Sequence, residues 1–478
     1  MKLFSYFAAL AAGLSLCAGL SAAQYTFSNT TYSVNDAPEG LASGDLNGDG
    51  FLDLVVTATN PDRMEVWLND ADGTYTLGST LLLSAGDDPR HVVLADLDGD
   101  LMLDAAILLY GTNQLQLATG LGGGTFALGS TFATGLNPVD IETQDADGDQ
   151  DADLLVVNQG DDNVTLFFND GAGVMTGMNF AVGDVPHGCT FGDFDGDLDW
   201  DFAVSNSVDQ TISVYENQGQ GVFASWSTII GNHDFYGIIA GDFDGDLDDD
   251  LAVISTDFFL VNEVTIFMSD GLGGWGAQTD WHNPLKGLSE IAMGDFDCDG
   301  DLDLVAASVD PTNGGFMLHD NDGSGGFGVF SRDGRGQHVT DIVAADLNND
   351  GSPDVANSAR NLDFLAVALN RTCGLKITRN GHCNQMNDFV FSGATPGGVV
   401  YAMVAHDPGT FVIPVGKPCA GTTVGLDAAS IMLAGFEVAD LNGEVHVSFW
   451  GGSLSCGMWL QILDAETCNV SNLSQLTP

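Results

Sequence analysis

Seven acidic loops recur along the chain, and their carboxylates are spaced to hold a cation. Each loop reads Asp-x-Asp/Asn-x-Asp-x-x-x-Asp, so oxygen-bearing side chains stand at positions 1, 3, 5 and 9. If the loop curls, these side chains converge, and position 7 adds a backbone carbonyl. Ca²⁺ takes six to eight such oxygens, whereas Mg²⁺ prefers fewer carboxylates and more water. Histidine is absent from these positions, which argues against zinc. The pattern therefore predicts up to seven structural Ca²⁺ ions, each clamping two strands.

The predicted metal ligands come from all seven loops, with a position-7 carbonyl named in loops one, six and seven. Loops one to three supply Asp45, Asn47, Asp49, Phe51, Asp53; Asp96, Asp98, Asp100, Asp104; and Asp145, Asp147, Asp149, Asp153. Loops four and five supply Asp193, Asp195, Asp197, Asp201; and Asp242, Asp244, Asp246, Asp250. Loops six and seven supply Asp295, Asp297, Asp299, Asp301, Asp303; and Asp346, Asn348, Asp350, Ser352, Asp354.

The elements that position these loops repeat with them. The loops start 51, 49, 48, 49, 53 and 51 residues apart, a period that fits one four-stranded propeller blade. Each repeat runs from an apolar strand through the loop to a second apolar strand, and then to a third strand that ends in an Asn/Asp/Gly turn. A Gly-x-aromatic element usually opens the fourth strand. The sequence therefore predicts an all-β chain with a seven-bladed β-propeller.

The two ends of the repeat array predict how the ring closes. The seventh repeat ends near residue 371 without a fourth strand, and the segment from Gln24 to Val34 resembles the fourth strands of other repeats. We expect this segment to complete the last blade, which would remove exposed sheet edges. Residues 24–371 then form the propeller, and the strand-like runs of 372–478 predict a small β-sandwich-like domain.

The net charge and the first residues of the chain indicate an exported protein and exclude some classes of partner. The chain has 478 residues, 67 Asp+Glu, 11 Lys+Arg and a formal net charge of −56, which disfavours binding to nucleic acids or anionic membrane surfaces. Residues 1–23 have the charged start, apolar stretch and small-residue end of a signal peptide. No later run is long enough to span a membrane. We therefore expect a secreted or cell-surface protein; the sequence leaves its oligomeric state open.

The repeats resemble the FG-GAP/VCBS family, whose blades also build the integrin α-subunit propeller. Residues 44–53 (GDLNGDGFLD) and 294–303 (GDFDCDGDLD) carry the resemblance most clearly. The family implies a seven-bladed propeller with calcium on the loop face, and it leaves the function open. Position 6 departs from the family's usual glycine in loops two to five, which have Leu101, Gln150, Leu198 and Leu247. Because a left-handed turn costs energy for such residues, these loops are expected to curl differently or to bind metal more weakly.

A second cluster of polar residues precedes the loops by five positions. His91, Asp140, Glu290 and Asp341 occupy this place in four repeats. If the following strand is innermost, they form a partial ring at one mouth of the channel. The ring could hold a cation or perform acid–base chemistry, but ordinary polarity at strand starts also explains it.

Aromatic and cysteine residues give further expectations. Trp67, Phe167, Tyr215 and Phe267 share one repeat position, with Leu117 and Met317, and are expected to pack between blades. Trp200, Trp226, Trp275 and Trp281 match no such position and are the better candidates for a sugar-binding surface. Cys189 is expected to be a buried thiol, and two disulfides are expected among Cys373, Cys383, Cys419, Cys456 and Cys468, with proximity favouring Cys373–Cys383 and Cys456–Cys468.

Function is predicted from scaffold and export, because no hydrolase, phosphate-loop or dinucleotide motif occurs. The leading prediction is a non-enzymatic binding or adhesion module for carbohydrate or a surface protein. The alternative is a secreted carbohydrate-active enzyme, of the polysaccharide lyase or glycosidase type, with acids at the channel mouth. A purely structural surface protein is the third.

Overall fold

The strands alternate with the acidic loops along the whole repeat region. The computed structural model describes residues 27–34, 37–256, 262–276, 278–283, 285, 287–297, 299–310, 314–333 and 338–370, and strand segments between 376 and 475. Its described residues contain strands and turns but no helix, and therefore no apolar helix long enough to cross a bilayer. The all-β prediction is confirmed.

Residues 27–370 form seven four-stranded antiparallel sheets, one for each predicted repeat. The first strands, which mostly begin with proline or an apolar residue, are β2 (Pro38–Gly44), β6 (Pro89–Ala95), β10 (Pro138–Gln144), β14 (Pro186–Gly192), β18 (Asp234–Gly241), β22 (Leu288–Gly294) and β26 (Val339–Ala345). The second strands, which all begin with the aspartate at loop position 9, are β3 (Asp53–Thr59), β7 (Asp104–Leu109), β11 (Asp153–Asn158), β15 (Asp201–Asn206), β19 (Asp250–Thr256), β23 (Asp303–Ser308) and β27 (Asp354–Ala359).

The outer strands complete each blade. The third strands are β4 (Asp62–Asn69), β8 (Gln114–Gly120), β12 (Asn163–Asn169), β16 (Thr211–Asn217), β20 (Asn262–Phe267), β24 (Gly315–Asn321) and β28 (Phe364–Asn370). The fourth strands are β5 (Tyr75–Leu82), β9 (Phe126–Ala133), β13 (Met175–Ala181), β17 (Phe223–Ile230), β21 (Thr279–Asn283), β25 (Phe327–Asp333) and, for the last blade, β1 (Phe27–Ser33).

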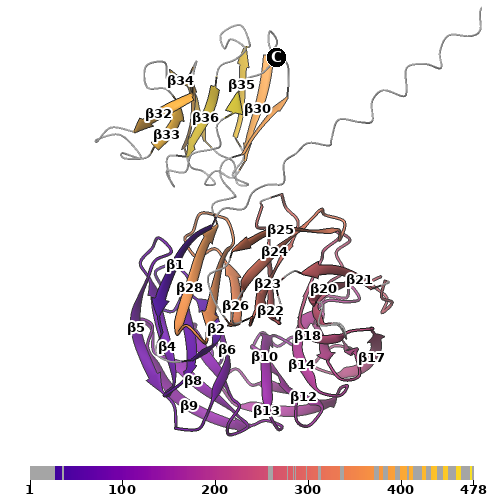
Figure 1. Cartoon of the computed structure of the whole chain (residues 1–478). Helices are drawn as coiled ribbons and strands as arrows, with labels where there is room; N and C mark the ends of the chain where they lie inside the picture. Colours follow the sequence, from indigo (N-terminus) through magenta and orange to yellow (C-terminus); the bar gives the residue numbers. More distant parts are fainter. Residues whose placement is uncertain are drawn as a thin grey trace, which may run out of the picture.

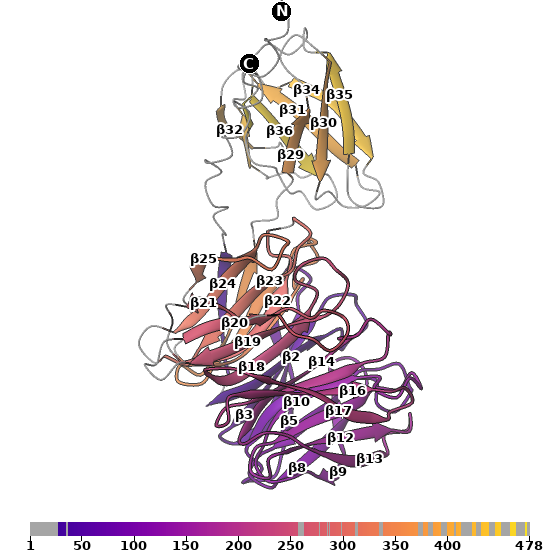
Figure 2. The same ribbon diagram turned by 90° about the vertical axis from the view of Figure 1, so that its right-hand side faces the viewer.

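The blades surround a central channel. Each first strand contacts the first strand of the next blade, and β26 contacts β2 to close the ring. Figure 1 shows strands such as β10, β14 and β22 toward the middle and β5, β9 and β13 at the outer rim. Figure 2, a view turned by 90°, shows the strands of successive blades crossing one another obliquely. The seven-bladed propeller predicted from the repeats is therefore confirmed.

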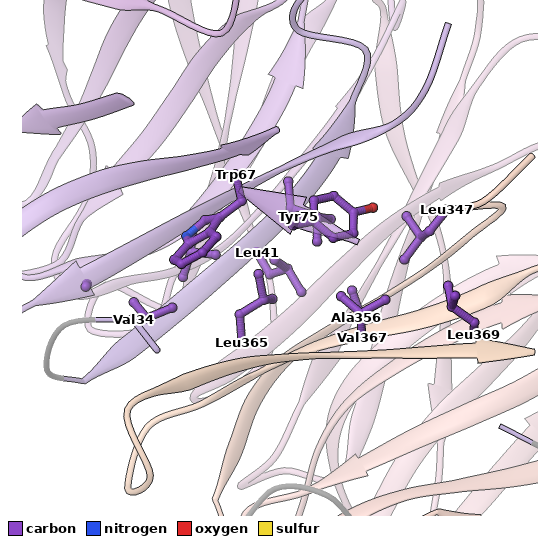
Figure 3. Packing of buried hydrophobic residues seen from close by; sticks show 12 residues of the cluster. Val34, Leu41, Trp67, Tyr75, Leu347, Ala356, Leu365, Val367 and Leu369 are labelled. Carbon is purple, nitrogen blue, oxygen red and sulfur yellow. The ribbon is translucent and has the colours of Figure 1, made fainter. Parts of the chain in front are cut away.

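The N-terminal strand closes the ring, as expected. β1 pairs antiparallel with β28 along its whole length, from Phe27 opposite Asn370 to Ser33 opposite Phe364. Side chains of the first and last blades then share one buried cluster, in which Trp67 and Leu41 meet Leu365 and Val367 (Figure 3). β1 therefore covers the outer side of β28 and gives the last blade the same four strands as the others.

A ring of hydrogen bonds joins neighbouring blades on the loop side. In six blades, the side chain at or just after the end of the third strand donates to the position-2 carbonyl of the preceding blade's loop, at 2.7–3.0 Å. The donors are Asn69, Asn169, Asn217, Ser269, Asn321 and Asn370. The second blade has Gly120 there, and the backbone amide of Gly124 donates to the Leu46 carbonyl instead, at 2.9 Å.

The C-terminal strands form three further sheets, ordered β29–β30–β35, β34–β31–β36–β37 and β32–β33. They are β29 (Lys376–Asn380), β30 (Met386–Ser392), β31 (Val399–Ala405), β32 (Pro408–Val412), β33 (Thr423–Leu426), β34 (Met432–Val438), β35 (Val445–Trp450), β36 (Trp459–Asp464) and β37 (Ser474–Gln475). The sandwich arrangement stays a prediction. The signal segment 1–23, Cys298 and the five C-terminal cysteines lie outside the described residues.

We predict that Asn217→Ala lowers the free energy of unfolding by about 1–3 kcal/mol, because it leaves a buried carbonyl without its donor. Asn217 Nδ2 donates to the Ala146 carbonyl at 2.8 Å and to the Trp200 carbonyl at 3.1 Å. Urea unfolding of both proteins in the same buffer measures the change, with the exposed neighbour substitution Gln218→Ala as control. Equal stability of the two variants would contradict the role of this bond.

Candidate metal loops and central channel

Each acidic loop curls around its own first aspartate. In loop one, Oδ1 of Asp45 accepts the backbone N–H groups of Gly48 at 2.8 Å and Asp49 at 3.2 Å, and Oδ2 accepts that of Gly50 at 2.9 Å. The bond from position 6 to Oδ2 of position 1 recurs in all seven loops, at 2.8–3.1 Å. The loops therefore share one curled conformation.

The aspartate at position 9 lies under the loop and fixes it to the blade. All seven are at most 2 % exposed. One carboxylate oxygen accepts the N–H of loop position 2, at 2.9–3.2 Å, and the other accepts an N–H at the end of the third strand, at 2.6–2.9 Å. Sequence reasoning identified these residues only as ligands and missed this clamp, although each stands at the first position of an apolar strand.

Burial raises the pKa of these position-9 carboxyls, and the other loop carboxylates add to the effect. The pKa rises to about 7 for Asp153, Asp201 and Asp250, and to about 8 for Asp303 and Asp354. The two backbone N–H bonds act in the opposite direction because they favour the ionised form. Each loop therefore holds negative charge that its own donors do not fully compensate.

The donor set of the loops fits Ca²⁺. Three carboxylate oxygens lie within 4.8 Å of one another in loops two to five, for example from Asp96, Asp98 and Asp104. In loop two, Oδ1 of Asp98 is buried and makes no hydrogen bond to any described atom. A buried carboxylate oxygen without a donor is costly unless a cation meets it. Several oxygens and no nitrogen or sulfur favour a hard ion.

The expectation that loops two to five curl differently is wrong. At position 6, φ is positive in every loop, from 67° at Leu101 to 101° at Gly300. Leu101, Gln150, Leu198 and Leu247 thus adopt the left-handed conformation that glycine takes in loops one, six and seven. Hydrogen bonds to the aspartates at positions 1 and 9 hold the loop at both ends. The residue type at position 6 therefore does not change the backbone conformation. Weaker metal binding in these loops stays a prediction.

The four polar residues that precede the loops do lie together. His91, Asp140, Glu290 and Asp341 line one cavity of about 280 Å³ in the channel. His91 Nδ1 is 3.5 Å from an Asp140 oxygen, and its Nε2 is 4.0 Å from a Glu290 oxygen. Asp341 is tied down by the N–H groups of Leu41 and Ile342, both at 2.7 Å.

Two further residues line this cavity: Glu142, which was not expected from the sequence, and Cys189, whose expected burial as a free thiol is confirmed. Glu142 lies two residues beyond Asp140 on β10. The backbone N–H of Cys189 donates a hydrogen bond to Asp140 Oδ2 at 2.9 Å. Burial, together with Asp140 and Asp341, raises the pKa of Glu142 to about 8. Burial raises the pKa of Asp341 to about 6 although His91 lowers it, and burial among the other acids also raises that of Glu290. The cavity thus holds protonatable acids beside an imidazole.

The aromatic residues at the shared repeat position are placed as expected, whereas the four other tryptophans are more buried than expected. Trp67, Phe167, Phe267, Leu117 and Met317 are buried between blades, and Tyr215 packs there too, as predicted. Trp226 and Trp275, however, pack against the cluster of blades four and five, and Trp281 packs against that of blades five and six. Trp200 is also half-buried. Trp226, Trp275 and Trp281 are therefore partly buried packing residues, and sugar binding by any of the four stays a prediction.

A family model described as "FG-GAP-like repeat" matches residues 45–107, 193–253 and 295–356. Each match begins at the first aspartate of an acidic loop, namely loops one, four and six, and ends in the second strand of the next blade. The chain carries FG-GAP-like repeats. A comparison with curated proteins found no match.

Two solved structures share the propeller fold. One, BBS1N in complex with ARL6DN and soaked with lead, is 12 % identical, with a TM-score of 0.51, and covers 72 % of this chain and 96 % of that one. The other, selenomethionine-substituted virginiamycin B lyase from Staphylococcus aureus, is 11 % identical, with a TM-score of 0.51, and covers 72 % and 99 %. At this identity the likeness concerns the fold alone.

We predict that Glu142→Gln stabilises the protein near pH 8 by on the order of 1 kcal/mol, because channel water screens part of the effect. The unfolded carboxyl ionises near its ordinary pKa, whereas the folded one keeps its proton up to about pH 8. Stability is therefore lost as pH rises through that window, and glutamine removes the loss.

Urea unfolding of both proteins at about pH 4 and pH 8 checks this result. The advantage should disappear at the lower pH, where the carboxyl is protonated in both states. Glu216→Gln, on an outer strand, serves as the matched control. An equal gain at both pH values would contradict the titration of Glu142.

Proposed function

We propose that this protein is a secreted binding module that calcium stabilises and that docks a basic protein partner on its loop face. The loop face is defined by the seven acidic loops and the turns between third and fourth strands. In an antiparallel blade, the first and third connections lie at the same end of the sheet. The turn glycine Gly171, for example, lies beside Asp151 of loop three.

The observation that carries the proposal is the set of exposed aliphatic residues at the tips of this face. Leu101, Leu198 and Leu247 are 92 %, 86 % and 84 % exposed in their acidic loops. Exposed residues of the neighbouring turns join them: Leu121, Val174, Val222 and Leu272. These tips belong to blades two to five. Exposed apolar groups gathered on one face are typical of interaction surfaces.

Backbone strain supports the same interpretation. A left-handed conformation costs a non-glycine residue about 1–2 kcal/mol, and Leu101, Leu198 and Leu247 all adopt it. Their side chains gain no packing in return, because they are exposed. Glycine occupies the same position in loops one, six and seven at no such cost. Strain without a folding benefit is a feature of functional sites.

Charge indicates the kind of partner. The loops hold 26 carboxylates at the ligand positions, and seven divalent ions would offset only about half of that charge. The face would remain acidic with apolar tips even when calcium is bound. A basic protein surface with apolar pockets complements it, and such complementarity speeds and orients association. The half-buried tryptophans favour a protein over a carbohydrate ligand.

We predict that chelation lowers the melting temperature by several degrees or more. A site that binds only the native state adds about 2.7 kcal/mol when free calcium is a hundredfold above its Kd. Asp98→Asn should bind one Ca²⁺ fewer than the native protein, as counted by equilibrium dialysis. The exposed Asp184→Asn, in the link before blade four, should bind the full number. An unchanged melt in excess EDTA would overturn the calcium assignment.

The docking proposal is tested on arrays of extracellular proteins and glycans, probed with calcium-loaded protein and again in EDTA. We expect calcium-dependent binding to basic proteins, weakened at least tenfold by Leu101→Gln, Leu198→Gln and Leu247→Gln together. Gln150 shows that the same loop accepts glutamine in this conformation. Leu82→Gln, Leu136→Gln and Ile230→Gln on the opposite side are the matched control. Binding only to glycans, or binding that ignores the loop leucines, would contradict the proposal.

The carbohydrate-active enzyme is the second candidate, and the channel favours it. His91, Glu142, Glu290 and Asp341 share one cavity, and burial raises the pKa of all three acids. An acid that keeps its proton near neutral pH can protonate a leaving group. Product release from a polysaccharide, lost in Glu290→Gln, would establish this activity; no release from any polysaccharide would exclude it.

A further inference from the structure

We infer that His233, Glu263 and Asp280 form a binding site for a divalent transition metal of the zinc class, separate from the seven acidic loops. His233 lies in the link between β17 and β18, Glu263 on β20 and Asp280 on β21. One ligating atom of each lies within 4.8 Å of the other two. The site is at the edge of blade five on the side opposite the loop face, and it is independent of the proposed docking function.

Two of the three distances in this triad match those between ligands around a shared ion. His233 Nε2 lies 3.5 Å from Glu263 Oε2 and 3.5 Å from Asp280 Oδ2. A direct N–H···O bond would be about 2.7–3.2 Å long. Zinc bonds of about 2.0–2.2 Å at the tetrahedral angle place neighbouring ligand atoms about 3.3–3.6 Å apart. With the Glu263 and Asp280 oxygens within 4.8 Å of each other, the three atoms are spaced closely enough to share one ion.

The imidazole is buried and aimed at the two carboxylates. The His233 side chain is 11 % exposed, and its Nδ1 is buried without a hydrogen-bond partner among the described atoms. The carboxylates are more open, with Asp280 29 % exposed. Only Nε2, which faces both carboxylates, is offered to an ion, and Nδ1 lies outside the triad. The open side would leave the fourth metal position to water, as in zinc sites with three protein ligands.

Neighbouring hydroxyl and amide groups orient the Asp280 carboxylate. Its Oδ1 accepts hydrogen bonds from Thr265 Oγ1 at 2.9 Å and from Gln278 Nε2 at 2.6 Å. Ser255 in turn lies 2.7 Å from the Thr265 hydroxyl. These bonds occupy one oxygen and turn the other, Oδ2, toward His233. Such outer hydrogen bonds fix ligands in metal sites.

The corresponding positions of blade three show what this part of a blade contains without a metal site. There Asn158, Asn163, Thr165 and Asn179 bond to one another at 2.8–2.9 Å. The cross-strand register places Ser255, Glu263, Thr265 and Asp280 at the same four positions of blade five. Two neutral amides are thus replaced by carboxylates, and a histidine is added beside them. Blade five therefore has a set of charged donor groups where blade three has a network of neutral hydrogen-bonding groups.

The chemistry of the donors selects the ion. Imidazole suits zinc, copper, iron and nickel, whereas the acidic loops offer only oxygen to calcium. The alternative for the triad is a protonated His233 paired with both acids and no metal. The two cases are distinguishable because only the first binds a metal ion when all the calcium loops are filled.

The test uses the full mature protein in saturating calcium, titrated with Zn²⁺ against a chromogenic chelator. We expect one equivalent of zinc to bind more tightly than any other. His233→Gln should abolish this equivalent, and Asp280→Asn should weaken it by at least about tenfold, because losing a ligand costs no less than losing a group that orients one. His338→Gln is the matched control, because His338 lies in a comparable link, between β25 and β26, but beside Arg360.

Cobalt gives a second readout that does not depend on folding of a variant. Co²⁺ added to the calcium-loaded native protein should develop the intense visible bands of a tetrahedral site, and zinc should bleach them. Melting curves confirm that each variant is folded. Native zinc binding that His233→Gln leaves unchanged, or cobalt spectra typical only of octahedral oxygen ligands, would overturn the assignment and leave the protonated ion pair as the explanation.

Discussion

The rest of the propeller depends on one buried carboxylate in each blade, the aspartate at loop position 9. It binds the amide of its own loop and the amide at the end of the third strand, so it joins three parts of one blade. The residue that supplies the second amide then donates its side chain to the preceding loop in most blades. Loop shape, strand register and contact between blades therefore share one set of polar contacts. Because that carboxylate is buried, the same contacts create the need for a proton or a cation.

Much of this architecture could be predicted from the chain. The seven-fold period, the strand order and the closure by the N-terminal strand all follow from spacing and apolar patterning, and the pairing of β1 with β28 confirms the closure. Leu101 and Leu198 show where residue preference misleads. A left-handed leucine is unfavourable by itself, but the bond from its amide to the first aspartate recurs in every loop and fixes φ. Local preference was overruled by a repeated hydrogen-bond pattern.

The sites were predicted less completely than the fold, since they depend on packing between blades. His91 and Asp341 were placed in the channel by their distance from the loops, whereas Glu142 was missed. Glu142 lies two residues beyond Asp140 in unbroken register, so the alternation of side chains along a strand would have placed both on one face. Trp226 and Trp275 were expected at the surface because they match no repeat position, but they fill the gap between blades four and five. His233 belongs to no motif, and only the fold brings it to Glu263 and Asp280.

The acidic loops, the channel residues and the His233 triad differ in which positive charge can neutralise them. This difference indicates a different role for each. In the loops, oxygens converge with backbone amides already bound, which favours a hard divalent ion. In the channel, His91 faces several acids at 3.5–4.0 Å and the raised pKa values favour protonation. In the triad, one nitrogen lies 3.5 Å from each of two oxygens, a donor set that suits a transition metal. With only 11 Lys+Arg for 67 Asp+Glu, side-chain cations cannot neutralise all three groupings. Ions or protons from the surroundings must therefore balance the remaining negative charge.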